Sequence, residues 1–161
     1  MIACICSFFN YNNNTLRREL YEKFREKFKY PLLTAEIALD EKDFSIEDSY
    51  KILANERNIL WQKERSFNIL LQQIPKEYDK IAWVDTDICF ENDNWLDEMD
   101  CKLDEYLMVQ GFENVYEESG NNNVLNCQGY GKCVHDFVFN NTRIPNNFAI
   151  GLCWGINRSY I

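Results

Sequence analysis

The stretch Tyr78–Trp95, YDKIAWVDTDICFENDNW, decides the fold class of this 161-residue chain. Its apolar run Ile81–Val84 stops at a carboxylate, Asp85, and a second carboxylate follows at Asp87. A short apolar run bounded by charged residues predicts a strand buried on both faces, as in a parallel sheet covered by helices. Ligands of open α/β sheets bind beyond the carboxyl ends of such strands, so the two aspartates are candidate site residues.

The spacing of Asp85 and Asp87 predicts a metal site. The two residues are two positions apart, so on a continuing strand their side chains point the same way. Converging carboxylates repel each other unless positive charge lies between them. A hard divalent cation suits this position because it prefers oxygen ligands and can bridge to substrate phosphates. The pair therefore predicts a metal-assisted site for a phosphate-bearing substrate.

Elsewhere in its first two thirds, the chain alternates predicted strands and helices. We expect strands at Met1–Phe9 and Leu32–Leu39, and helices at Thr15–Lys29, Asn58–Ile74 and about Asp93–Tyr106. The first helix is predicted to be amphipathic, because an apolar residue recurs at every fourth position. These apolar residues are Leu16, Leu20, Phe24 and Phe28. The alternation predicts a three-layer α/β/α domain with a mostly parallel central sheet.

The pattern changes after Leu107. We expect a strand within Met108–Glu118, a long loop over the Asn- and Gly-rich Gly120–Gly131, and strands at Val134–Phe139 and Phe148–Ile156. Residues 1–161 form one domain in this interpretation, since no linker or repeat interrupts them. We expect a new apolar element to start at the last two residues, and therefore either a minimal fold or one that is truncated at its C-terminus.

Composition limits the class of protein. Hydrophobic residues make up 46% and aromatic residues 15% of the chain, which is typical of a packed globular domain. The net charge of -9 disfavours nucleic acid as a partner. We expect neither a signal peptide nor a membrane span, and the seven scattered cysteines favour reduced thiols in the cytoplasm. A missing closing element would leave apolar surface that a second copy of the chain could cover, so a homo-oligomer is one of the alternatives.

Three stretches resemble one family. They are MIACICSFFNYN (1–12), LWQKERSFNILLQQIPKEYDKIAWVDTDICFENDNW (60–95) and GLCWGINRSYI (151–161). Together they resemble GT-A glycosyltransferases of the kind encoded by large DNA viruses of chlorella-like algae. The resemblance implies a metal-dependent enzyme that uses Mn²⁺ or Mg²⁺ to move a sugar from a UDP-sugar to a glycan or protein-linked glycan. It also implies a nucleotide-sugar-binding half (1–106) and an acceptor-side half (107–161).

The resemblance implies roles for individual residues. Asp87, with Asp85, would bind the metal and serve catalysis, and Asp85 would lie nearer the ribose or sugar. The residues expected to bind the nucleotide sugar are Ser7, Phe8, Phe9, Lys63 and Asp85. The first three of these would form a loop around the base after the first strand. The residues expected on the acceptor side are Gly151 and Trp154, the latter offering a flat apolar face to a sugar ring.

Several side chains have competing interpretations. Lys63 and Arg65 both suit a phosphate, but two residues apart on a helix they cannot face the same point. We prefer Lys63 because it matches the family pattern. Trp61 and Trp83 are expected in the core, and one of Phe8 and Phe9 as well, because they alternate faces.

The later part of the chain offers candidates for a third metal ligand and a base. Cys127, Cys133 and His135 match no common zinc pattern. His135 with Asp136 is a candidate third metal ligand. Asp136 and the acidic residues near Glu117 are candidate general bases, without a preference between them.

Two other functions compete with a glycosyltransferase. A nucleotidyltransferase also uses paired carboxylates, but SFFNYNNN (7–14) lacks the glycine or lysine of a phosphate-binding loop. A non-catalytic nucleotide-sugar-binding module would bind the donor with metal and leave it intact.

Overall fold

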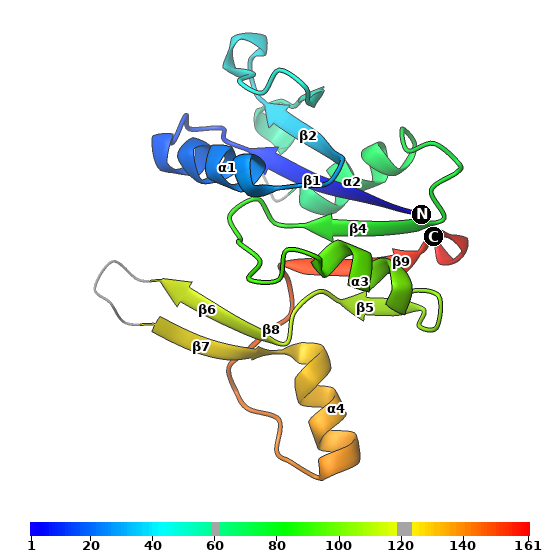
Figure 1. Ribbon diagram of the computed structural model, residues 1–161. Coiled ribbons are helices and arrows are strands. Elements are labelled where there is room, and N and C mark those ends of the chain that lie inside the picture. The colour runs from blue at the N-terminus through cyan, green and yellow to red at the C-terminus, as the bar shows by residue number, and fades with distance from the viewer. Residues whose placement is uncertain (59–61, 119–123) are drawn as a thin grey trace.

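The computed structural model describes residues 1–58, 62–118 and 124–161 (Figure 1). Its strands are β1 (Ile2–Phe9), β2 (Leu32–Ala38), β3 (Tyr50–Leu53), β4 (Lys80–Val84), β5 (Met108–Gln110), β6 (Asn114–Glu118), β7 (Val124–Gly129), β8 (Phe148–Ala149) and β9 (Cys153–Asn157). Its α-helices are α1 (Thr15–Lys27), α2 (Lys63–Leu71), α3 (Trp95–Lys102) and α4 (Tyr130–Asn140). The elements expected between residues 1 and 106 are present, although α2 and α3 are shorter than predicted.

The central sheet has the strand order β3-β2-β1-β4-β9-β5. The strands β3, β2, β1 and β4 are parallel to one another. The last strand, β9, lies antiparallel between β4 and β5, so β5 points the same way as β4. The sheet is therefore mixed and mostly parallel, which confirms the α/β class predicted from the alternation of elements.

Helices cover both faces of this sheet. On one face, Phe24 of α1 and Met99 of α3 belong to one buried cluster with strand residues such as Val84. On the other face, Leu70 of α2 is buried in a second cluster with Ile81. Figure 1 shows α1 and α3 in front of the sheet. The three-layer arrangement expected from the sequence is confirmed.

The helix α1 is amphipathic, but its buried face differs from the predicted one. Leu16 and Leu20 are 60% and 37% exposed, so the expected inward positions are wrong at the start of the helix. Tyr21 and Phe24 are buried instead, and Phe28 packs beside them. The side chain of Asn14 caps the helix by accepting a hydrogen bond from the Arg17 amide at 3.3 Å, which is its ordinary role at an N-cap.

The region after Leu107 differs most from the prediction. The strands β6, β7 and β8 form a second, smaller sheet, and β7 occupies much of the stretch 120–131 that was expected to be a loop. Residues 134–139, expected as a strand, lie within the helix α4. Figure 1 shows this sheet and α4 together beyond the β5 edge of the central sheet. Residues 119–123 lie outside the described ranges.

The connections around β1 define where a ligand can bind. From β1 the chain passes through α1 to β2 on one side, whereas β4 lies on the other side of β1. The two directions of winding separate between β1 and β4, and ligands of open α/β sheets bind in the crevice at that position. The carboxyl ends of β1 and β4 are Phe9 and Val84. The aspartates identified from the sequence therefore follow one of the two strands that flank this position.

Candidate functional site

Asp85 is held at the carboxyl end of β4 by its backbone and its side chain. Its amide donates to the carbonyl of Leu152 at 2.7 Å, which ties it to the chain just before β9. Its carboxylate forms an ion pair with the ammonium of Lys63, the first residue of α2. The two side chains are only 26% and 19% exposed, so water screens this pair less than a surface pair. The sequence predicted both residues at the site, and the structure brings them into contact.

Asp87 lies in a different environment. The strand β4 ends at Val84, and Thr86 and Asp87 form a turn, so the continuing strand expected through both aspartates is wrong. Asp87 is exposed and makes no ion pair with a residue in the described ranges. One carboxylate of the pair is therefore neutralised by a lysine, and the other faces solvent.

Whether a divalent cation fits here depends on the different environments of Asp85 and Asp87. Within the described residues, no three His, Cys, Asp or Glu side chains are grouped as a complete metal site. Mg²⁺ and similar hard cations are commonly bound through one or two carboxylates, with substrate phosphates and water completing the shell. Asp87, with Asp85 beside it in sequence, fits a cation of that kind, which a substrate helps to hold.

The expected base-binding residues lie within β1 and not in a loop after it. Phe8 is 2% exposed and its ring centroid lies 4.8 Å from that of Tyr21, so it is the core member of the pair. Ser7 and Phe9 are half-buried and point to the opposite face of the sheet from Phe8. Of the three residues predicted to contact the nucleotide, Ser7 and Phe9 are the ones with exposed surface at this end of the sheet.

The segment before β9 approaches the site closely. Gly151 is exposed, and a Cβ built on it would lie 4.0 Å from the Asp85 carboxylate. Leu152 has a φ of 72°, and the Cys153 amide donates to the Gly151 carbonyl at 3.0 Å across it. A three-residue turn with a positive central φ is rare and strained. Sequence reasoning missed Leu152 because its contact with Asp85 is made by the backbone.

Trp154 lies inside β9 and not in a loop. It is paired across the strands with Trp83 of β4, so both indoles lie on the face that α2 covers. Its indole nitrogen donates to the carbonyl of Ile150 at 2.5 Å. Trp154 and Trp83 are both half-buried, and Trp83 packs against the buried cluster under α2 as expected for a core residue. Trp61 lies outside the described residues.

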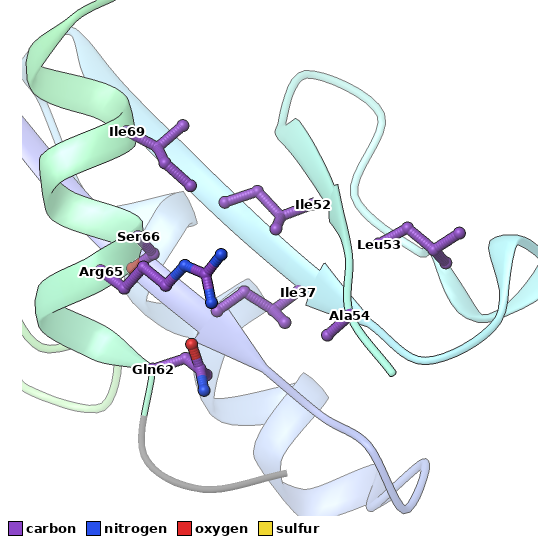
Figure 2. Close-up of a pocket in the computed structure, with 8 residues that line it drawn as sticks. All are labelled: Ile37, Ile52, Leu53, Ala54, Gln62, Arg65, Ser66 and Ile69. Carbon is purple, nitrogen blue, oxygen red and sulfur yellow. The ribbon is translucent and has the colours of Figure 1, made fainter. Parts of the chain in front are cut away.

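A small cavity of about 60 Å³ lies between α2 and the ends of β2 and β3 (Figure 2). Its lining residues are Ile37, Ile52, Leu53, Ala54, Gln62, Arg65, Ser66 and Ile69. Arg65 lines this cavity, whereas Lys63 contacts Asp85, so the prediction that the two cations face different points is confirmed. The cavity is much smaller than a typical ligand pocket, so it can accept part of a ligand at most.

The remaining candidates lie on α4 and the second sheet. His135 and Asp136 contact each other, with 3.3 Å between Nδ1 and Oδ1, and this hydrogen bond lowers the pKa of Asp136. His135 is 63% exposed, and neither residue belongs to a group of three possible metal ligands within the described ranges. The side chain of Glu117 lies outside the described residues. Within the described part of the chain, no contact links His135 or Asp136 to Asp85.

Comparisons with known proteins do not assign a family. No protein-family model matches the chain, and no curated protein matches it significantly. Among the described residues, no helix has the length and apolar character needed to cross a bilayer.

Proposed function

We propose that this chain is a GT-A glycosyltransferase that transfers a sugar from a UDP-sugar to a glycan acceptor with the help of Mn²⁺. The observation that carries the proposal is the pairing of Asp85 with Lys63 beside the exposed Asp87, at the carboxyl end of β4. This end lies where the winding of the sheet changes direction, the usual ligand position in open α/β sheets. The mixed, mostly parallel sheet is compatible with the GT-A fold.

The two aspartates take different roles in this proposal. Asp87 faces solvent and would hold the Mn²⁺ through its carboxylate, and diphosphate oxygens would supply further ligands. When bound, the ion would neutralise the charge that builds on the diphosphate as the glycosidic bond breaks. Asp85 is neutralised by Lys63, so it suits hydrogen bonds to hydroxyl groups of the ribose or sugar.

The remaining groups of the site would position the donor. Ser7 and Phe9 lie at the end of β1, next to β4 in the sheet, where a nucleoside would extend from the diphosphate. Arg65 and Gln62 line the small cavity between α2 and the ends of β2 and β3. They would add a cation and an amide to the site from α2 and the residue before it. Fixed donors of this kind raise rates by orienting the reacting groups before reaction.

The proposal is tested by ligand-dependent melting of the folded chain. A ligand that binds only the native state stabilises it and so raises the melting temperature. At a ligand concentration of 100 times the dissociation constant, the gain in unfolding free energy is about 2.7 kcal/mol. UDP is expected to raise the melting temperature with Mn²⁺ and not without it, and Asp87→Ala is expected to abolish this rise. Glu77→Ala, which removes an exposed carboxylate far from β4's carboxyl end, is the control and should respond like the wild type.

Two outcomes would contradict the proposal. An unchanged UDP response in Asp87→Ala would remove the metal role of that residue. A chain that binds UDP-sugars with Mn²⁺ but neither hydrolyses nor transfers them would be the non-catalytic binding module, and a donor-hydrolysis assay separates the two. A nucleotidyltransferase is disfavoured because the residues after β1, Asn10 to Asn14, contain no glycine or lysine.

A further inference from the structure

Gly151 differs from the other described glycines in what surrounds it. A Cβ built on Gly155 would lie 2.4 Å from the Met99 sulfur, and one on Gly111 would lie 2.6 Å from the Cys153 sulfur. Gly129 and Gly131 are also crowded, with nearest atoms at 2.8 Å and 3.1 Å. Close packing therefore accounts for the absence of a side chain at these positions.

No such packing requirement applies to Gly151. Its nearest described neighbour would be the Asp85 carboxylate, at 4.0 Å, which is an ordinary contact distance. Its φ is not positive, so an L-residue could adopt its backbone conformation. The absent side chain leaves open space beside Asp85. Neither the packing of the described residues nor the backbone conformation of Gly151 explains why this position lacks a side chain.

The backbone of Gly151 is fixed in this position by its neighbours. Leu152 has a φ of 72°, and this conformation is energetically unfavourable for any residue that has a Cβ atom. The surrounding contacts maintain it, because the Leu152 carbonyl accepts from the Asp85 amide at 2.7 Å and Cys153 pairs with Val84. Strained conformations that persist in this way often mark functional sites. Gly151 is therefore held beside the Asp85 carboxylate by the first pairs of β9.

The charges beside Gly151 favour a neutral polar group. The Asp85 carboxylate is compensated by Lys63, so together they offer an acceptor and a donor without net charge. The uncompensated carboxylate is that of Asp87, in the exposed turn two residues further on. A cation with its diphosphate belongs near Asp87, and a group rich in hydroxyls belongs near Asp85.

We infer that Gly151 is a specificity-determining residue, whose missing side chain leaves room for the sugar of the donor beside Asp85. This inference rests on the proposed function. It places Gly151 beside the sugar of the donor and not on the acceptor side expected from the resemblance, and it adds which residue limits the size of the transferred group. A larger side chain at position 151 would occupy the space of the sugar but not the space of the nucleotide.

The test compares two substitutions at one position. Gly151→Leu fills the space, whereas Gly151→Ala adds only a methyl group at ordinary contact distance. Dissociation constants are measured by calorimetry with Mn²⁺ for UDP, UDP-glucose, UDP-galactose and UDP-N-acetylglucosamine. For the UDP-hexose that the wild type binds most tightly, Gly151→Leu is expected to weaken binding about tenfold or more, the scale of steric discrimination in binding pockets. UDP itself should change by less than about twofold, and Gly151→Ala should weaken binding of the UDP-hexose less than Gly151→Leu does.

The outcomes separate this inference from the proposed function. A wild type that binds no UDP with Mn²⁺ overturns the proposed function and this role with it. A wild type that binds UDP but no UDP-hexose, or a Gly151→Leu variant that binds both like the wild type, overturns the role of Gly151 alone. Equal weakening of UDP and UDP-hexose would place the nucleotide beside residue 151 and also overturn it. Gly151→Met, with a side chain of similar volume but greater flexibility, replaces Gly151→Leu if the latter does not melt cooperatively.

Discussion

At the scale of single residues, Glu36 illustrates how a buried charge fixes a connection between strands. Its side chain is 2% exposed in the middle of β2. Its carboxylate accepts hydrogen bonds from the Ser45 amide at 2.6 Å, the Ser49 hydroxyl at 2.8 Å and the Ile46 amide at 3.1 Å. These donors all belong to the segment that leads into β3, so Glu36 determines where that segment lies.

Replacing Glu36 should therefore destabilise the fold. Glu36→Ala leaves the buried Ile46 amide and the part-buried Ser45 and Ser49 donors without this acceptor, and the expected loss is about 2–3 kcal/mol of unfolding free energy. Urea denaturation measures this loss. Glu47→Ala, which removes an exposed carboxylate of the same segment, is the control and should stay near the wild-type value. Equal stability of Glu36→Ala and wild type would show that water or other groups satisfy the freed donors.

At the scale of single residues, the sequence predicted those members of the candidate site that act through their side chains. Asp85 and Asp87 were identified from the sequence because a buried strand that ends in carboxylates is a strong local pattern, whereas Lys63 was preferred because it matches the family that the chain resembles. Leu152 was not identified, because its part in the site is a carbonyl and a positive φ, and neither depends on a recognisable side chain. The separation of Asp85 from Asp87 into two environments depends on the turn after Val84, which no local pattern indicated.

At the scale of elements, α1 shows why a regular apolar spacing can mislead. Steps of four residues advance about 40° beyond a full turn each, so Leu16 and Phe28 lie about 120° apart around the helix. A stripe with this spacing winds away from the sheet, and only its later members are buried. Tyr21, Phe24 and Phe28 follow the three-and-four spacing that keeps one face inward. The existence of the helix was predictable, whereas its rotation was decided by the sheet.

The helix α4 was assigned to the wrong class for a related reason. Its apolar run Phe137–Phe139 is 53–73% exposed, so it does not pack as a buried strand would. Cys133 is the buried residue within this helix. Asn141, with a φ of 53°, ends it in the left-handed conformation that asparagine tolerates. A short exposed apolar run on a helix resembles a strand when only the sequence is read.

Arg158 connects two elements and should be sensitive to substitution. Its guanidinium donates to the carbonyls of Pro75 at 2.7 Å and Ile74 at 3.1 Å, near the end of α2. A lysine keeps the charge but cannot reach several carbonyls at once, so Arg158→Lys should cost about 1–2 kcal/mol of unfolding free energy. Thermal denaturation measures this cost, with the exposed Arg143→Lys as the control. A similar small effect in both variants would contradict the connecting role.

At the scale of the whole molecule, the distribution of cysteines describes the core. All seven are free thiols, of which Cys89 and Cys101 are exposed. The buried ones are Cys4, Cys6, Cys133 and Cys153. Burial raises the pKa of Cys6 to about 12 and the pKa of Cys4 well above the usual range. Between the ordinary value of 9.0 and about 12, the unfolded chain loses the Cys6 proton and the folded chain keeps it, so stability should fall as pH rises through that window.

This distribution predicts the reactivity of the folded chain toward a thiol reagent. Near pH 8, Cys89 and Cys101 are expected to react at once, and Cys127, which is half-buried, more slowly. The four buried thiols should react only after unfolding in guanidinium, because the reagent cannot reach them in the folded chain. A variant with both Cys89→Ser and Cys101→Ser should lose the fast phase. Rapid reaction of four or more thiols in the native chain would contradict the described core.

The overall architecture was predictable as far as local alternation determines it. Strands followed by helices indicated a mostly parallel, three-layer domain, and the sheet and its two covered faces confirm this. The insertion of β9 between β4 and β5 was not predictable, because it joins Ala82 to Gly155 across a long separation in sequence. Non-local pairing of this kind depends on how α3 packs against Gly155, and no local motif indicates it.

The position of β9 also sets an order for the growth of the sheet during synthesis. Within the central sheet, β5 has β9 as its neighbour and does not touch β4. Residues 108–110 therefore leave the ribosome well before 153–157, the partner against which they form their ladder. Until that partner emerges, β4 keeps one open edge and the nascent chain carries a three-residue strand with nothing to pair with. The parallel strands β1, β2, β3 and β4 pair with one another and all precede residue 85, so they can assemble first.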